Sequence, residues 1–415
     1  MQRIYCDHNA TTPLDPRVLT RMVETAQVCF GNPSSVHSEG RRARQAIEQA
    51  RAQVASLIAA HSSEIVFTSG GTESNNLALR GAAALIARRQ GRPARILSSA
   101  LEHPSVRQTL VALADQGCVV NELACDAQGR LPTAQLAEAL HERPADLVSF
   151  ALCNHELGNL YPIAELAAIA HAHGALVHCD AVQAVGRVPV SVRELDIDLL
   201  SLSAHKFFGP KGVGALYVRP HRAAGSRPAS SRSVERARVL PSPTLPSLAE
   251  LPALLHGGSQ ERGLRPGTEN LLGIVGLGEA ALLCLNGQLA RWSQVAPLRD
   301  ALEARVLASI AGARRHGDSE SSAGRAPGAL SLAFDQVEGE LLLMNLDLRG
   351  IAVSTGAACS SGSIKPSPVM RALGLDEVRA REAIRISLGP DTTAADIDRI
   401  VAAICESVAQ VRAVK

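Results

Sequence analysis

The chain has 415 residues, of which 46% are hydrophobic and 20% charged, proportions typical of a globular protein. This length exceeds what one simple core holds and predicts two domains. Its 42 Lys and Arg residues balance 40 Asp and Glu residues, so the charge gives no reason to expect nucleic acid or an anionic membrane as a partner.

The N-terminal stretch MQRIYCDHNATTPLDPR has no apolar segment of the kind that directs export, and no uninterrupted apolar run reaches membrane-spanning length. We therefore expect a cytoplasmic protein. The nine cysteines include no CxxC pair. Most, such as Cys118 and Cys179, lie in apolar runs typical of buried, reduced thiols. Cys359 is the exception, because it lies in the polar stretch STGAACSSGSIKP.

From residue 64 onward, short β-rich runs alternate with longer helical patterns. The β-rich runs cover 64–70, 95–103, 118–123, 146–156, 175–182, 198–206 and 213–219, and helical patterns follow the first, second, third and fourth of them. This alternation predicts an α/β fold with a mainly parallel sheet covered by helices on both faces. Polar segments follow the runs at the edge where such sheets bind ligands.

The rest of the chain has a different character. Residues 220–252 are rich in Ser, Pro and Arg without periodicity, which indicates a surface insertion. After residue 284, shorter β and α units end in a terminal helix and predict a smaller α+β domain. We assign 15–284 to a large domain, and 1–14 with 285–415 to a small domain whose loop carries Cys359.

Two residues at the strand ends suggest cofactor chemistry. Lys206 follows an apolar run in SLSAHKFFGPKG, and Asp180 ends the run LVHCD. A buried aspartate is costly unless it pairs with a cation. A lysine that bonds covalently to pyridoxal phosphate and an aspartate that faces the pyridine nitrogen form the pair which that cofactor requires.

A phosphate-binding segment is expected beside this pair, and TSGGTES fits it. Gly71 lets the backbone approach an anion, the following helix points its N-terminal N–H groups there, and Thr72 adds a hydroxyl. Ser203 and His205, which flank the lysine, can add further donors.

With these residues in view, the chain resembles the cysteine desulfurases of the class-V aminotransferase fold, in the branch that serves nitrogenase and housekeeping iron–sulfur assembly. The resemblance runs from Asp7 to about Gly389 and implies pyridoxal phosphate-dependent fold type I. It rests on YCDHNATTPLDPRV, FGNPSSVHSEGRRAR, FTSGGTESNN, EHPSV, HCDAVQAVGRVPV, SLSAHKFFGPKGVGALYVR, HGGSQERGLRPGTEN, STGAACSSGSIKPSPVMRALG and AIRISLG, in this order.

The resemblance implies a role for each matching residue toward the cofactor. It makes Lys206 the lysine that carries the cofactor, Asp180 the partner of the pyridine nitrogen, and Gln183 the donor to the phenolic oxygen. His103 matches the histidine that stacks on the ring and takes part in proton transfers. The phosphate contacts that it implies are Gly71, Thr72, Ser203, His205 and, from the second subunit, Thr268.

The substrate side is assigned in the same way. Arg385 matches the arginine that grips the substrate carboxylate, Asn32 lies in a motif near the substrate, and Cys359 matches the nucleophile that receives sulfur. Gly356 and Gly362 predict backbone freedom for the segment that carries Cys359. The resemblance implies no resident metal, although it leaves open that Cys359 transiently ligates an iron–sulfur cluster.

Two features depart from the family pattern. Where the family usually reads NNE, this chain has Asn154, His155 and Glu156, so either Asn154 or His155 contacts the ring oxygen. The insertion after Arg219 is the second departure, and it precedes a segment expected to reach the partner subunit.

The resemblance implies a cysteine desulfurase that converts L-cysteine to L-alanine and keeps the sulfur as a persulfide on Cys359. The expected partners are a second copy of the chain and a sulfur acceptor such as an iron–sulfur scaffold, and neither nucleic acid nor membrane. Two alternatives stay open: a selenocysteine lyase or other class-V aminotransferase or lyase, and a catalytically silent protein that docks a scaffold.

Overall fold

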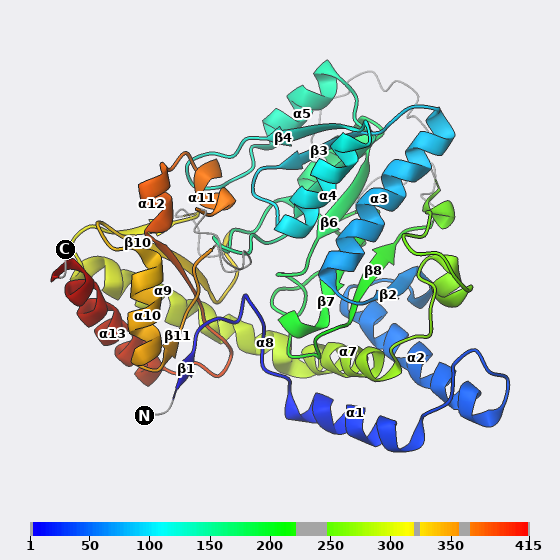
Figure 1. Ribbon diagram of the computed structural model, residues 1–415, viewed down its shortest axis with the longest axis horizontal. Helices are drawn as coiled ribbons and strands as arrows, with labels where there is room; N and C mark the ends of the chain where they lie inside the picture. Colours follow the sequence, from blue (N-terminus) through cyan, green and yellow to red (C-terminus); the bar gives the residue numbers. More distant parts are fainter. Residues whose placement is uncertain (1–2, 221–246, 319–323, 357–365, 414–415) are drawn as a thin grey trace.

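The computed structural model describes residues 3–220, 247–318, 324–356 and 366–413 (Figure 1). Cys359, Gly362 and most of the predicted insertion at 220–252 lie outside these residues. The described part has two regions with separate hydrophobic cores, and a large sheet forms the centre of the first.

Within the described residues, seven strands form the large sheet. Only β8 runs opposite to the other six strands, so the predicted mainly parallel α/β sheet is confirmed. In spatial order the strands are β2 (Ile65–Thr68), β8 (Gly214–Val218), β7 (Leu199–Ser203), β6 (Leu176–Asp180), β5 (Leu147–Ala151), β3 (Arg95–Ser99) and β4 (Val119–Leu123).

Helices cover both faces of this sheet because successive strand residues enter different cores. Val66, for example, packs with α3 (Gly71–Gln90) and α4 (Pro104–Asp115), whereas Phe67 packs on the opposite face. The helices of that opposite face are α2 (Ser38–Leu57), α5 (Thr133–Glu142), α6 (Ile163–Ala172) and α7 (Leu271–Leu283). Helix α1 (Pro16–Val28) packs against α7 at the edge of the region (Figure 1).

One helical stretch, Leu271–Ser309, is long and apolar enough to cross a membrane by length and composition alone, with a mean hydropathy of 1.4 in its most apolar window. That window is 56% buried inside the protein, and its first part, α7, packs extensively against α2. The stretch is also interrupted by a π-helical turn at Cys284–Gln288. These features are those of a core helix.

The second region is built on a three-stranded antiparallel sheet in the order β12 (Ala383–Ser387), β10 (Ala329–Phe334) and β9 (Ala313–His316). A short parallel pair joins β1 (Ile4–Tyr5) to β11 (Ile351–Ala352), so the N-terminal strand belongs to this second core. The helices of this later part of the chain are α8 (Leu289–Arg291), α9 (Val295–Ser309), α10 (Gly339–Leu348), α11 (Pro368–Ala372), α12 (Glu377–Arg381) and α13 (Ala394–Ala413). Helices α9, α10 and α13 pack into the second core, whereas the buried side chains of α11 and α12 join the first.

Short 3-10 turns complete the described chain. They lie at Ser62–Glu64, Ala204–Lys206, Leu248–Glu250, Gln260–Gly263 and Trp292–Gln294. The turn Ala204–Lys206 follows β7 directly, and it places Lys206 at the carboxyl edge of the large sheet.

Candidate active site

The carboxyl edge of the large sheet gathers most of the predicted site. His103 follows β3, Asn154 to Glu156 follow β5, Asp180 ends β6, and Ser203 ends β7 just before Lys206. These strands run parallel, so their carboxyl ends meet at one edge. The spacing of the apolar runs therefore brings these side chains to one place.

Asp180 is buried, with 6% of its surface exposed, and it accepts two hydrogen bonds. Asn75 Nδ2 donates to Oδ2 at 2.8 Å, and the backbone N–H of Val182 donates to Oδ1 at 3.0 Å. The Asn75 amide also donates to Ser105 Oγ at 2.9 Å. Asn75 lies in the FTSGGTESNN stretch but was not among the predicted site residues, and its buried position on α3 gives it this role.

The N-terminal segment closes over Lys206. Lys206 Nζ donates to the carbonyl oxygens of Asn9 and Ala10 at 2.6 and 2.9 Å. Arg187 stabilises this arrangement, since it donates to the carbonyl oxygens of Lys206, at 3.2 Å, and of His8, at 2.6 Å. Burial lowers the pKa of Arg187 to about 10. Asn9 and Arg187 were not predicted as site residues.

The predicted phosphate segment also lies at this edge. Helix α3 begins at Gly71, and a β-carbon there would come within 2.6 Å of the Val182 side chain, so the position requires glycine. Ser203 is buried, and His205 Nδ1 lies 3.1 Å from the Thr11 hydroxyl. Burial, and then the charge of Lys206, lowers the pKa of His205 to about 4. The N–H groups of the first turn of α3 make this edge suitable for an anion.

His103 is held in one tautomer. Its Nδ1 accepts a hydrogen bond from the Ser105 backbone N–H at 3.1 Å, so the neutral ring carries its proton on Nε2 and donates there. Burial, followed by the charge of His155, lowers the pKa of His103 to about 4. His103 is therefore a neutral donor at physiological pH.

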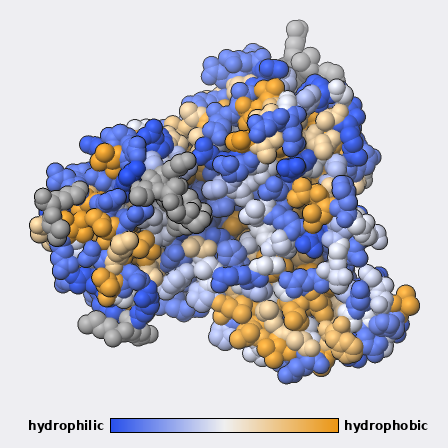
Figure 2. All heavy atoms as spheres, in the orientation of Figure 1, coloured by the Kyte–Doolittle hydropathy of each residue, from blue (hydrophilic) through white to orange (hydrophobic). Residues whose placement is uncertain are grey.

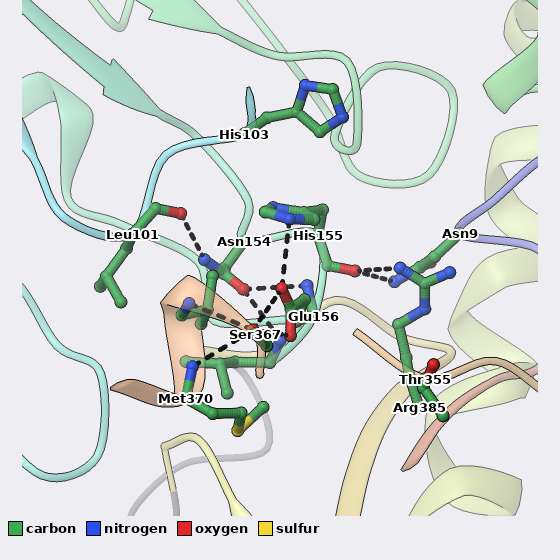
Figure 3. A network of polar contacts seen from close by, with 12 residues as sticks. Asn9, Leu101, His103, Asn154, His155, Glu156, Thr355, Ser367, Met370 and Arg385 are labelled. Atoms are coloured by element: carbon green, nitrogen blue, oxygen red, sulfur yellow. Dashed lines mark hydrogen bonds and ion pairs between the residues drawn. The ribbon is translucent and has the colours of Figure 1, made fainter. Parts of the chain in front are cut away.

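The structure separates the roles of Asn154 and His155. Asn154 is fully buried, and its amide is used within the loop: it donates to the Leu101 carbonyl at 3.0 Å and accepts from the N–H groups of Glu156 and Leu157. The His155 ring instead lies next to His103, with the ring centroids 5.2 Å apart and the planes at 78° (Figure 3). Of the two, His155 is the one whose side chain faces His103.

Arg385, in β12, connects the second region to this group. Its Nη1 donates to the His155 carbonyl at 3.0 Å, and its Nη2 pairs with Asp7 Oδ1 at 2.9 Å. Its backbone exchanges hydrogen bonds with Ser354, at the start of the segment that carries Cys359. Arg385 therefore lies where it can bind a carboxylate between the two regions.

These residues fit pyridoxal phosphate. Asp180 is a buried carboxylate held by two neutral donors, and a protonated pyridine nitrogen would offset the penalty of burying its charge. Gln183 differs from its expected role, since Nε2, the donor that would reach the phenolic oxygen, donates to the Asn9 carbonyl, and its buried Oε1 has no hydrogen-bond partner among the described residues. Among those residues, no three His, Cys, Asp or Glu side chains come together in a way that could hold a metal ion.

Comparison with known proteins agrees with this geometry. The family model described as aminotransferase class-V matches residues 4–400. The chain belongs to the class-V aminotransferases. It is 44% identical to a cysteine desulfurase from Cereibacter sphaeroides, in an alignment of 419 residues that covers 100% of this chain and 97% of that protein.

Solved structures give the same result. A "NifS-like protein" matches with a TM-score of 0.83 and 33% identity, over 99% of this chain and 100% of that one. A structure described as "SspA in complex with cysteine" matches with a TM-score of 0.74 and 33% identity, over 94% of this chain and 100% of that one. The predicted family, fold type and pyridoxal phosphate dependence are confirmed.

In this class-V aminotransferase, two predicted site residues lie apart from the others. Asn32 is exposed in the loop between α1 and α2, where its Oδ1 accepts from the Ser34 N–H at 2.9 Å. Thr268 is exposed just before α7, three residues after Arg265, which pairs with Glu73 in the first turn of α3. Their roles, like those of the other predicted site residues, remain predictions, and Cys359 lies outside the described residues.

Proposed function

We propose that the protein is a cysteine desulfurase that uses pyridoxal 5′-phosphate to take sulfur from L-cysteine, releases L-alanine and holds the sulfur on Cys359. The observation that supports this most is the group at the sheet edge, where Lys206, Asp180 and His103 meet Arg385 from the second region. This group can hold the cofactor and an amino acid together. Relatives named as cysteine desulfurases are similar over the full chain.

When bound, the cofactor supplies an electron-accepting ring that makes the Cα proton of an amino acid acidic. Lys206 would hold the cofactor, Asp180 would keep its nitrogen protonated, and the first turn of α3 would bind its phosphate. Arg385 would bind the carboxylate of the substrate with its planar guanidinium. Its pairing with Asp7 means that the substrate carboxylate must compete for the same nitrogen.

The proton and sulfur steps follow from the same residues. Once released from the Asn9 and Ala10 carbonyls, Lys206 Nζ can take and return the Cα proton. His103, as a neutral imidazole, can donate a hydrogen bond from Nε2 to the reacting group. The Cys359 thiolate attacks the sulfur of the substrate, so a sulfur–sulfur bond forms while the Cβ–S bond breaks, and protonation of the substrate carbon yields alanine. One cysteine and one thiol thus give one alanine and one persulfide.

The test is to measure alanine and persulfide from L-cysteine for the wild type, Cys359→Ala and Lys206→Ala. We expect both variants to lose alanine formation. Undiminished activity in Cys359→Ala would refute the persulfide step and favour another lyase or aminotransferase. A protein that shows no change in absorbance with added pyridoxal phosphate would instead be a silent docking partner. Parallel assays with selenocysteine determine which substrate is preferred.

We also propose that two copies of the chain pair through the face of α1 and the loop after it. Five large apolar side chains are exposed there, and Phe30 and Val36 are 81% and 87% exposed. Figure 2 shows the apolar surface over α1 at the lower edge of the molecule. A patch of this kind favours a protein interface. The five residues are Leu19, Val23, Val28, Phe30 and Val36.

The acceptor and the compartment are further parts of the proposal. An iron–sulfur scaffold protein would take the sulfur from Cys359, which a transfer assay with ³⁵S-labelled cysteine would test.

A cytoplasmic location is supported by the eight described cysteines, all of which are free thiols. Five of them are buried, whereas Cys118, Cys125 and Cys405 are half-buried rather than fully buried as expected.

A further inference from the structure

Glu156, next to His155 in the loop after β5, is a buried carboxylate that the roles above do not use. Its side chain is 2% exposed, and both of its oxygens lie within hydrogen-bond distance of Ser367 Oγ, at 2.8 and 2.7 Å. His155 Nε2 lies 3.5 Å from Glu156 Oε1 (Figure 3). The carboxylate therefore lies between the histidine pair and the second region.

Glu156 also contacts the chain on the other side of Cys359. A β-carbon on Gly356 would overlap the Glu156 carboxylate, so the backbone at Gly356 lies directly against this group. Ser367, in turn, caps α11 by accepting from the N–H groups of Val369 and Met370. Gly356 and Ser367 are thus two described residues on either side of Cys359 that meet at one buried carboxylate.

The charges around Glu156 favour its ionised form. Burial alone would raise the pKa of Glu156, but hydrogen bonds from His155 and Ser367 and the charge of Arg385 outweigh burial and lower it below its ordinary value. On the other side of His155 lies the His103 ring, whose pKa the charges of Asp180, Lys206 and Arg385 also affect. The interaction with His155 lowers the pKa of both neighbours, so it favours the anionic form of Glu156 and the neutral form of His103.

We propose that His155 and Glu156 are a positioning pair, in which Glu156 holds Gly356 and Ser367 in place and His155 links this carboxylate to the His103 ring. An asparagine in place of His155 could donate a hydrogen bond but could not carry the charge. The pair thus couples the protonation state of His103 to the anchoring of the chain on both sides of Cys359. This proposal rests on the proposed function only because that function gives Cys359 a role.

The first test measures the anchoring without turnover. The rate at which iodoacetamide modifies Cys359 is followed by mass spectrometry in the holoenzyme for the wild type, His155→Asn, Glu156→Gln and the double variant. We expect Glu156→Gln to raise the rate by about tenfold, the lower end of what losing a hydrogen bond to a charged group allows. The double variant should be no faster than the faster single variant, because coupled residues are not additive.

Glu382→Gln is the matched control. Glu382 is another buried glutamate of the second region, which accepts from the Gln336 N–H at 2.8 Å and pairs with Arg314, and it has no contact with the pair. It should lower the thermal unfolding temperature without changing the modification rate of Cys359. An unchanged rate in Glu156→Gln, or rates that multiply in the double variant, would overturn the proposal.

The second test measures how His155 and Glu156 affect the protonation of His103. Titration of ¹⁵N-histidine-labelled protein by NMR gives the protonation midpoint of His103, which burial and then His155 hold at about 4. His155→Asn removes a positive charge beside the ring, so the midpoint should rise, and it should rise less in Glu156→Gln. A midpoint unchanged in both variants would refute the coupling. Neither test depends on desulfurase activity, so a wild type that makes no alanine refutes only the proposed function.

Discussion

Replacing Asp7 by asparagine should strengthen the binding of amino acids. Asp7 pairs with Arg385 Nη2 at 2.9 Å, and the two side chains are 20% and 7% exposed. A substrate carboxylate must displace this partner or share the guanidinium with it, and it is also repelled by the Asp7 charge. The neutral amide removes both effects, while the hydrogen bond from Arg385 to the His155 carbonyl still orients the guanidinium.

The size of the effect follows from the pair. A hydrogen bond between charged groups contributes about 1.5–3 kcal/mol. Asp7 is one-fifth exposed, so solvent screening reduces this to about 1–2 kcal/mol. The dissociation constant should therefore fall by about 5- to 30-fold.

The ligand for this assay is L-alanine, which carries the carboxylate but has no sulfur to transfer, so its affinity can be measured by calorimetry without turnover. Cysteamine, which has the thiol and the amine but no carboxylate, is the control ligand, and its affinity should not change. Asp347→Asn is the control variant, because Asp347 pairs with Arg3 on the exposed surface. An unchanged or weaker affinity of Asp7→Asn for L-alanine, or an equal gain for cysteamine, would refute the reasoning.

Three further predictions concern the cofactor, pH and assembly. Asn75→Ala removes a donor to Asp180 and should weaken the retention of pyridoxal phosphate by about tenfold, measured by absorbance after dialysis; unchanged retention would contradict the role of Asn75. Burial lowers the pKa of His178 to about 4, so its contribution to the free energy of unfolding is complete above pH 6.5 and is lost as the pH falls toward 4. His178→Gln should reduce this acid dependence by on the order of 3 kcal/mol in denaturant titrations, and an identical pH profile would refute the role of His178. Phe30→Asp should shift the protein toward monomer in light scattering, whereas a stable dimer would place the interface elsewhere.

The large sheet was predictable because its strands are short apolar runs separated by turns and helices. The direction of β8 was not predicted. Only residues 204–213 join β7 to β8, and this is shorter than the dozen or more residues that a parallel crossover needs. The length of the connection therefore contained the signal for the antiparallel strand.

The strand-end residues Lys206, Asp180 and His103 could be found from the sequence because each directly follows or ends an apolar run. Asn9 and Arg187 could not be found in this way. Asn9 contacts Lys206 across 197 positions, and Arg187 acts mainly through backbone carbonyls, which leave no mark on the residue types around them. Contacts of this kind become visible only when the chain has folded.

Gly356 shows a different limit. The sequence suggested that this glycine provides backbone freedom. In the structure its φ is not positive, and its role is to let the backbone approach Glu156, where any side chain would collide. A glycine that is flexible and a glycine that is tightly packed look the same in the sequence, because both are defined only by the missing β-carbon.

The pairing of the first strand with late parts of the chain has a consequence for biosynthesis. Ile4 pairs with Ile351, and the Asn9 N–H is bonded to Ser387 Oγ, so the segment whose carbonyls hold the Lys206 amine is completed by contacts some 350 residues or more away along the chain. At a translation rate of 5–20 residues per second, a ribosome needs about 20–80 s to reach β12. During that time the emerging lysine is not yet enclosed. The enclosure of Lys206 by the N-terminal segment is therefore complete only after the last strand has left the ribosome.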